Sequence, residues 1–380
     1  MIKILFWLSI LAVVYSYILY PALLVLLSRF WKTKRAVFQD NYFRVSLIVA
    51  AYNEEKVIRQ KIENTLALDY PRELMQIIIA SDGSTDGTNQ IVREFARQGV
   101  ILLEFRERRG KINVLNEAVS KANGEIIVFS DANTMFASDA VKKLVRHFGQ
   151  PSIGCVCGQL HFQCSEGSRT GELEGFYWKF ETMLKKIEGS RGSLLGANGG
   201  IYALRKSLYE PCPSNTIVED FVIPMKILQR GYRVIYDPEA KATEVVVTHI
   251  IQEMARRIRI GAGDFQALFM LLSMLNPLRG FSALAFFSHK VLRWFAPFLL
   301  ILIFVTNMFL LQQDFYFYFF VIQLGFYLFA LIGRFLTRIG RYVKLFSLSY
   351  YFVSMNIALL IGFFKYITAS QKVAWERTER

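Results

Sequence analysis

Between Lys3 and Arg29 the chain has 25 consecutive uncharged residues, most of them aliphatic. A helix of that length is long enough to cross the hydrocarbon core of a bilayer, which is roughly 30 Å thick. Basic residues follow at once, at Arg29 and Lys32, and this asymmetry places the C-terminal side of the helix in the cytoplasm. Because Pro21 and the length argue against a cleaved signal peptide, residues 1–30 are predicted to be a retained transmembrane anchor.

Similar uncharged runs occur near the other end of the chain. They are residues 294–313, 315–333 and 345–364. Each is long enough to span, so residues 291–368 are predicted to form transmembrane helices and residues 369–380 a charged tail. The basic linker 334–344 should lie inside, and strict alternation then puts the tail outside although it is basic too. The number of crossings and the side of the tail therefore stay open.

The net charge of +14 is concentrated beside these apolar ends. Residues 1–40 contribute +4 and residues 281–380 contribute +7, whereas the 240 residues between them contribute only +3. This distribution favours contact with anionic lipid over nucleic-acid binding, which would need a basic face on the folded middle. Residues 264–290 include a 14-residue uncharged run, too short to span, and are predicted to form an interfacial amphipathic segment.

In the middle of the chain, short apolar runs alternate with helix-like stretches. The predicted strands are Val45–Ala51, Gln76–Ala80, Val100–Phe105 and Glu125–Phe129, and the predicted helices are Glu54–Leu68, Thr85–Gln98, Lys111–Ala122 and Ser138–Phe148. This repeat predicts an α/β fold with a doubly wound, mostly parallel sheet. In such sheets ligands bind at the carboxyl ends of the strands, so the polar residues at those ends are the candidate site.

Three predicted strands end in polar residues. The first ends in Ala51-Tyr52-Asn53-Glu54, and the second in a loop that begins with Asp82. Either could be ordinary turn chemistry, but two adjacent acidic strand ends favour a site for a nucleotide base and ribose. The fourth strand ends in Asp131-Ala132-Asn133, whose alternate side chains could offer oxygen ligands to a divalent cation or could close an Asx turn. A third polar end on one rim favours the cation site.

Seven motifs occur in a fixed order along residues 45–263. They are VSLIVAAYNEE, ASDGSTDGT, RRGKINVLN, FSDANT, GANGGIYALR, VEDFVIP and RRIRI. Together with the flanking apolar segments they resemble family 2 glycosyltransferases, and among these the membrane-embedded synthases of cellulose, hyaluronan and poly-N-acetylglucosamine. The resemblance implies a GT-A-like nucleotide-sugar fold for a cytoplasmic domain over residues 31–263.

The resemblance also implies roles on the donor side. Asp82 would contact the uracil of a UDP-sugar, and Lys111 would lie near the nucleotide. Asp131 and Asn133 would hold Mg²⁺ or Mn²⁺ with the diphosphate, although the family usually has a second Asp where this chain has Asn133. The residues that would line the base and ribose are Ala51, Tyr52, Asn53 and Glu54.

On the acceptor side, Asn198 and Gly199 would belong to the acceptor loop, with Glu219 beside it. Asp220 would be the general base that removes the proton of the acceptor hydroxyl. Taken alone, a glycine turn and two carboxylates that suit the start of a helix explain these residues equally well or better.

Arg256 and Arg259 would bind the leaving diphosphate. The Gln and Trp of the signature found there in processive relatives are absent, which puts processivity in doubt, and a basic helix facing lipid headgroups is nearly as good an explanation.

The expected protein is an inverting β-glycosyltransferase, multi-pass in the cytoplasmic (inner or plasma) membrane. It would transfer a sugar from a UDP-sugar to a growing polysaccharide, such as an extracellular or capsular one, or to a lipid-linked saccharide. A homo-oligomer or an accessory export subunit could complete a conduit. The alternatives are a non-processive transferase that adds one sugar to a lipid carrier, and a catalytically silent scaffold that binds nucleotide. Neither the sugar, the linkage nor any regulator follows from the sequence.

Overall fold

The computed structural model describes residues 1–31, 42–164, 170–246 and 250–371, and the chain divides into two compact units. The sheet unit comprises Lys32–Glu166, Lys185–Val247 and Lys372–Arg380. The helical unit comprises Met1–Trp31, Gly167–Leu184 and Thr248–Gln371.

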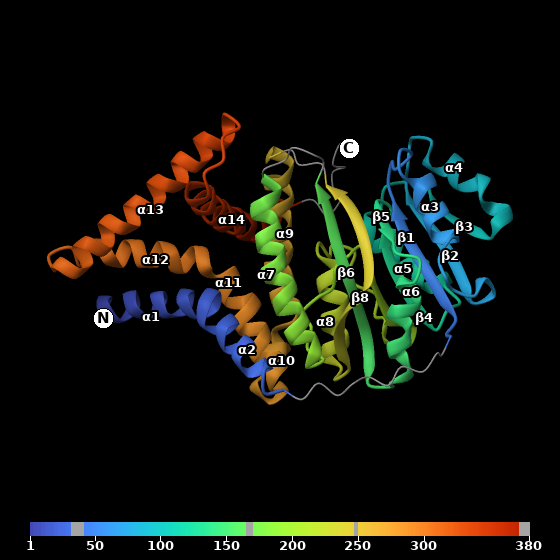
Figure 1. Cartoon of the computed structure of the whole chain (residues 1–380), viewed down its shortest axis with the longest axis horizontal. Coiled ribbons are helices and arrows are strands. Elements are labelled where there is room, and N and C mark those ends of the chain that lie inside the picture. The colour runs from blue at the N-terminus through green and yellow to red at the C-terminus, as the bar shows by residue number, and fades with distance from the viewer. Residues whose placement is uncertain (32–41, 165–169, 247–249, 372–380) are drawn as a thin grey trace. The chain divides into compact units, whose positions relative to one another are not determined.

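The sheet unit is built on one mixed sheet with the strand order β3-β2-β1-β4-β7-β6-β8-β5 (Figure 1). The strands are β1 Val45–Ala51, β2 Met75–Asp82, β3 Val100–Phe105, β4 Ile126–Asp131, β5 Thr134–Phe136, β6 Ile153–Cys164, β7 Tyr202–Arg205 and β8 Arg233–Val246. β3, β2, β1 and β4 are parallel to one another, as the sequence predicts, and each predicted strand matches an observed one within two residues.

The register of the parallel strands brings their polar ends to one edge. Ala50 of β1 lies opposite Asp131 of β4, and Ala51 lies opposite Ser81 of β2. The candidate residues after these strands therefore meet at the rim where a doubly wound sheet binds its ligands.

Helices cover both faces of the parallel half. Leu47 and Val49 of β1 share a buried core with Ile58 and Ile62 of α3 and with Leu144 of α6, whereas α5 packs on β1 and β2 without belonging to that core. The helices are α3 Ile58–Leu66, α4 Thr88–Glu94, α5 Lys111–Lys121, α6 Ala140–Val145 and α8 Glu219–Gln229.

The strand pairings in the remaining half of the sheet are not predicted from the sequence. β7 runs antiparallel to β4 and to β6, and the three-residue strand β5 runs antiparallel to β8. The long strands β6 and β8 pair in parallel with register shifts at Gly158 and near Ile153. The sheet is thus parallel on the side of β1 to β4 and mixed on the side of β5 to β8.

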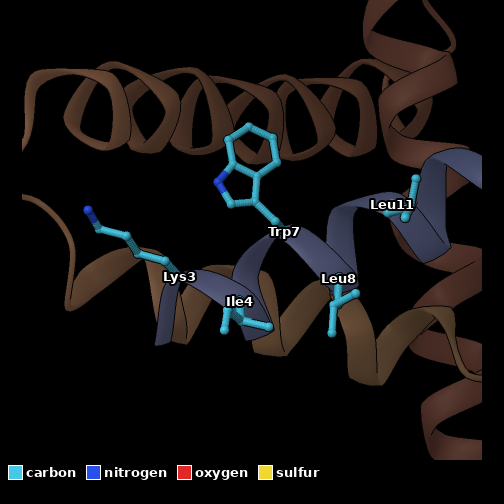
Figure 2. Close-up of a pocket in the computed structure, with 5 residues that line it drawn as sticks. All are labelled: Lys3, Ile4, Trp7, Leu8 and Leu11. Carbon is cyan, nitrogen blue, oxygen red and sulfur yellow. The ribbon is translucent and has the colours of Figure 1, made fainter. Parts of the chain in front are cut away.

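The helical unit contains long apolar helices. Within the described residues, three are long and apolar enough to cross a membrane: Ile2–Ser28, Asp314–Arg338 (α13) and Lys344–Ile367 (α14). The first consists of α1 Ile2–Val14 and α2 Tyr20–Ser28, joined by a π-helical turn. A shallow hollow on α1, lined by Lys3, Ile4, Trp7, Leu8 and Leu11, contains none of the predicted site residues (Figure 2).

The run predicted as a crossing at residues 294–313 has a different form. Residues Phe281–Trp294 and α12, Ala296–Met308, are two helices bent by 58° at a short break, as in a broken span or a re-entrant loop. Pro297 at the start of α12 lacks the N–H that a continuous helix would use. The described part of the chain therefore has three candidate spans, or four if the bent pair counts as one.

α9, Ile250–Met270, packs against α14 within the helical unit. The two backbones approach closely because both contribute glycine: a Cβ at Gly362 would lie 2.7 Å from the backbone nitrogen of Ala262. Small residues permit such close helix contacts in membranes. Arg257 of α9 also lies over the ring of Tyr351, 5.0 Å from its centroid.

The N-terminal part of α7, Thr170–Ser190, carries a buried ion cluster of the helical unit. Glu181 is 5% exposed, and its carboxylate lies 2.6 Å from the Lys290 ammonium, 3.1 Å from His289 Nε2 and 3.5 Å from Arg293. Burial would raise the pKa of Glu181, but the neighbouring cations hold it well below its ordinary value. The carboxylate is therefore ionised and joins α7 to the segment 286–294.

Candidate active site

Asp82, the last residue of β2, forms hydrogen bonds with the loop that joins β3 to α5. Asp82 is 2% exposed, and its two carboxylate oxygens accept hydrogen bonds from the backbone N–H groups of Arg109 (2.6 Å) and Gly110 (3.0 Å). Gly110 has a φ of +87°, a backbone conformation that residues with a Cβ rarely adopt. Asp82 thus fixes the backbone immediately before Lys111, and its predicted contact with the donor base remains a prediction.

The end of β1 is joined to the loop after β2. Asn53, with a φ of +54°, accepts a hydrogen bond from the backbone N–H of Thr85 (2.8 Å), and its own N–H donates to Ser84 Oγ (3.1 Å). The guanidinium of Arg108 lies over the ring of Tyr52, 3.9 Å from its centroid. Ala51 and Glu54 are buried in the same segment. The four residues predicted to line the base and ribose are therefore consecutive residues at the carboxyl end of β1, joined by hydrogen bonds to the loop after β2.

Lys111 connects the donor and acceptor sides of the candidate site. Its Nζ lies 2.8 Å from Asp131 Oδ1 at the end of β4 and 2.8 Å from Glu219 Oε1 at the start of α8. Burial alone would lower the pKa of Lys111, but these two carboxylates outweigh burial and raise it. Lys111 is therefore a fixed positive charge at the centre of the carboxylate cluster.

The predicted metal-binding pair has a partner that the sequence did not reveal. Asn133 Nδ2 donates a hydrogen bond to Glu244 Oε1 of β8 (2.7 Å). This bond orients the amide of Asn133 and places a carboxylate beside it.

The donor set fits a cation that is shared with a substrate. Within the described residues, no three His, Cys, Asp or Glu side chains are grouped closely enough to form a protein-only metal site. Asp131 and Asn133 offer oxygen ligands, which suits Mg²⁺ or Mn²⁺ bound by one or two side chains together with phosphate oxygens.

Asp220 lies at the start of α8, next to the glycine-rich loop before β7. A Cβ at Gly199 would lie 3.0 Å from Asp220 Oδ2, so glycine leaves room for this carboxylate. Burial raises the pKa of Asp220 to about 6, with a further rise from the charge of Glu219 that Lys111 partly offsets. A carboxylate with this pKa is ionised at neutral pH and still basic enough to accept a proton.

Asn198 of the same loop is held by three contacts. Its Oδ1 accepts a hydrogen bond from Lys185 Nζ (2.6 Å), its Nδ2 donates to the carbonyl of Gly158 (2.8 Å), and its backbone N–H donates to Cys157 Sγ (3.1 Å). Asn198 is 8% exposed. The loop that carries Asn198 and Gly199 is therefore anchored from α7 and β6.

Arg256 and Arg259 lie on α9 and belong to the helical unit, whereas the other predicted site residues belong to the sheet unit. Their spacing of three residues puts them on neighbouring positions of one helix face. Their binding of the diphosphate remains a prediction.

Three site residues were missed by the sequence reasoning: Lys185, Glu244 and Arg108. Lys185 stands in a stretch with several other lysines, and Glu244 lies in a strand without a recognisable motif. Arg108 is the first residue of the motif that holds Lys111, so its position was the one available signal.

The sheet unit thus gathers carboxylates and ammonium groups at one rim. Lys111 joins Asp131 to Glu219, the neighbour of Asp220 in the chain, and Lys185 bonds the loop that lies next to Asp220. Such a site can bind a phosphorylated ligand beside a cation and can accept a proton next to it.

Comparison with known proteins finds a family model that matches part of the chain and a solved structure of similar fold. Residues 46–210 match the family model described as glycosyl transferase family 2. The chain carries a family 2 glycosyltransferase domain. The matched residues include the candidate-site positions from Ala51 to Gly199, whereas Glu219 and Asp220 follow the matched region.

The curated relatives include poly-beta-1,6-N-acetyl-D-glucosamine synthases. That of Staphylococcus aureus (strain COL) is 26% identical over 235 residues, which cover 60% of this chain and 56% of the relative. That of Staphylococcus epidermidis is 26% identical over 230 residues, which cover 59% of this chain and 55% of the relative. The match thus spans little more than half the length of these relatives.

Among solved structures, a mannosyltransferase of Pyrobaculum calidifontis, in complex with GDP-Man and Mn²⁺, has a similar fold. The TM-score is 0.71 at 22% sequence identity, and the alignment covers 97% of this chain and all of that chain. The fold of this chain therefore recurs, over nearly its whole length, in a solved structure.

Proposed function

We propose that this glycosyltransferase is an inverting enzyme that transfers a sugar from a UDP-sugar to a growing polysaccharide or a lipid-linked saccharide at the membrane. The observation that carries the proposal is Asp220, a partly buried carboxylate whose pKa is raised to about 6 beside the glycine-rich loop. The relatives' role in making poly-β-1,6-N-acetylglucosamine supports a polysaccharide product.

In the proposed reaction, Asp220 accepts the proton of the acceptor hydroxyl as its oxygen attacks the anomeric carbon. The bond between that carbon and the diphosphate breaks, and its electron pair leaves with the diphosphate. Attack from the side opposite the leaving group inverts the anomeric configuration. Asn198, Gly199 and Glu219 line the acceptor side in this proposal, because Gly199 and Glu219 lie next to Asp220 and Asn198 belongs to the same loop as Gly199.

Lys111 would stabilise the negative charge that develops on the diphosphate. It lies 2.8 Å from Asp131, so its ammonium is already within the predicted phosphate-binding region. A bound Mg²⁺ or Mn²⁺ would be held by Asp131 and Asn133 and would supply further charge neutralisation. The Mn²⁺ complex of the P. calidifontis mannosyltransferase supports this choice of metal.

The enzyme is proposed to face the cytoplasm from a multi-pass position in the cytoplasmic membrane. The basic residues after Ser28 support this orientation, as do the three candidate spans. The three or four candidate spans among the described residues are few for a pore in one chain, so a second copy or an accessory export subunit is proposed as a partner.

The test is the release of nucleoside diphosphate by the purified protein in lipid nanodiscs with Mn²⁺ or Mg²⁺. The donor panel contains UDP-sugars and, because the P. calidifontis enzyme was solved with GDP-Man, GDP-sugars too. Release from one UDP-sugar that Asp220→Asn abolishes and that Asp139→Asn preserves supports the proposal. Release only from a GDP-sugar refutes the choice of donor, and nucleotide binding without any release points to a catalytically silent scaffold.

A second candidate is a transferase that adds a single sugar to a lipid carrier. It is favoured by Arg259-Ile260, where the processive signature would have Arg-Trp. Product length decides between the two: a ladder of oligosaccharides indicates a polysaccharide synthase, and one extractable glycolipid indicates single addition.

A further inference from the structure

Lys61 is a fully buried lysine behind the predicted metal-binding turn. It lies on α3, and its side chain is 0% exposed. Its Nζ donates hydrogen bonds to Ser130 Oγ (2.8 Å) and to the backbone carbonyl of Thr134 (2.5 Å), and it lies over the ring of Phe136, 4.3 Å from the centroid.

The ammonium of Lys61 has neutral partners only. Among the residues that the structure describes, no carboxylate forms an ion pair with it, and both hydrogen-bond acceptors are uncharged. An uncompensated buried charge is unfavourable for folding, and burial accordingly lowers the pKa of Lys61 to about 7 despite the nearby charge of Asp131. An apolar side chain of similar volume would suit the core at least as well, so stability does not explain the lysine.

The two contacts of Lys61 enclose the predicted metal ligands. Ser130 directly precedes Asp131, and Thr134 directly follows Asn133. The ammonium therefore joins the two ends of the turn Ser130–Thr134 through its hydrogen bonds to Ser130 and Thr134. Asn64, which lies almost one helical turn further along α3, extends the same support: its side chain bonds both the N–H (2.8 Å) and the carbonyl (2.9 Å) of Phe136.

The turn is also joined to the acceptor loop. Ser130 Oγ, which accepts from Lys61, donates to the carbonyl of Gly200 (3.0 Å). Gly200 packs closely on Thr134, because a Cβ there would lie 2.6 Å from Thr134 Oγ1. One side chain on α3 thus supports the turn with Asp131 and Asn133 and, through Ser130, the loop with Asn198 and Gly199.

We infer that Lys61 is a positioning residue of the transferase site, which holds the turn Ser130–Thr134 so that Asp131 and Asn133 present their oxygens to the cation and diphosphate. This inference rests on the proposed function. Its physical basis is that groups which orient metal ligands typically change metal affinity by about 10- to 100-fold when they are removed.

The experiment measures Mn²⁺ binding directly. Free Mn²⁺ is followed by electron paramagnetic resonance while the full chain in nanodiscs is titrated in the presence of UDP, and separately of GDP. Lys61→Met keeps the length and apolar packing of the side chain and removes the ammonium. Arg59→Met is the matched control, because Arg59 is a cation on the same helix whose side chain is 48% exposed and pairs with Glu94.

We expect Lys61→Met to weaken Mn²⁺ binding about tenfold and to raise the Mn²⁺ concentration for half-maximal turnover by a similar factor. Its melting temperature should stay within a few degrees of the wild type, and Arg59→Met should bind Mn²⁺ as the wild type does. A purely structural role would instead lower the melting temperature and leave Mn²⁺ affinity in the folded protein unchanged.

Lys61→Gln keeps a hydrogen-bond donor in the core and provides a second variant if Lys61→Met does not fold. Its expected Mn²⁺ affinity lies between those of the wild type and Lys61→Met. If either folded variant binds Mn²⁺ as tightly as the wild type does, the inference about Lys61 is overturned and the proposed function is not affected. If the wild type itself binds no Mn²⁺ with either nucleotide, the inference and the proposed metal-assisted function are both overturned.

Discussion

Replacing Asp220 by Asn tests the proposed general base with little change of shape. Removing a general base typically costs about 10²- to 10⁴-fold in rate, so kcat for nucleotide release should fall by at least about a hundredfold at pH 8. Donor affinity should change little, because Lys111 pairs with Asp131 and Glu219 and does not depend on Asp220.

The pH dependence gives a second readout of the same residue. Asp220 acts as a base only when deprotonated, and its pKa is about 6. For the wild type, kcat/KM should therefore rise about tenfold per pH unit below pH 6 and level off above pH 7. The small residual rate of Asp220→Asn should lack this rise.

The raised pKa of Asp220 also predicts that the Asp220→Asn variant is no less stable than the wild type. Because the pKa of Asp220 in the folded chain lies above its ordinary value of 3.8, the folded state binds the proton more tightly, and stability falls as pH rises from about 4 to about 6. Asp220→Asn removes this penalty, so at pH 8 its melting temperature should equal or exceed that of the wild type.

The control is Asp139→Asn, which removes a carboxylate that is 40% exposed and pairs with Lys143. Such surface pairs contribute little, so turnover and melting temperature should be unchanged. Turnover above a tenth of the wild-type rate in folded Asp220→Asn would refute the assignment, as would a wild-type profile without a rise below pH 6.

Three further substitutions test the rest of the site. Lys111→Met should weaken nucleotide binding at least tenfold, measured by calorimetry with UDP, and unchanged affinity would remove Lys111 from the donor site. Glu244→Ala should lower Mn²⁺ affinity about tenfold in a paramagnetic titration because Asn133 loses its hydrogen-bond acceptor; wild-type affinity would show that Glu244 does not orient it. Gly199→Ala should reduce kcat more than it raises KM for the donor, because the new methyl group would displace Asp220, 3.0 Å away. Equal kcat would contradict the role of that contact.

The parallel half of the sheet could be predicted because its signals are local. Each of the first four strands is a short apolar run followed by polar residues and a helix, and the observed strands agree. The antiparallel half depends on pairings between distant segments. β5 has only three residues, and its partner β8 begins about a hundred positions later, so no periodicity within either segment specifies the pair.

The candidate site was predictable where its residues follow strands or recognisable motifs. Asp131, Asp220 and Lys111 belong to such motifs, but the ion pairs of Lys111 with Asp131 and Glu219 are not predicted by them. Glu244 reaches Asn133 only through the pairing of β5 with β8, which is a tertiary event.

The helical spacing of α3 indicates that Lys61 faces the core, although its residue type suggests a solvent-exposed position. The buried positions of α3 are Ile58, Lys61, Ile62 and Thr65, which share one helix face at the spacing expected for a core-facing stripe. A lysine is usually assigned to the solvent side, so helical phase and residue type disagree at this position. Such a disagreement is itself an indication of a functional group.

The strand order has a consequence for how enzymes of this kind diverge. The proposed donor residues follow β1, β2 and β4 of the parallel half, whereas the glycine-rich loop precedes β7 of the antiparallel half. On these assignments, selection for a new acceptor can change the loop before β7 and leave the donor residues unaltered. Selection for a new donor can change the residues after β1, β2 and β4 and leave that loop unaltered. The two specificities are coupled mainly where β4 pairs with β7 and where Ser130 joins the buried ammonium of Lys61 to Gly200.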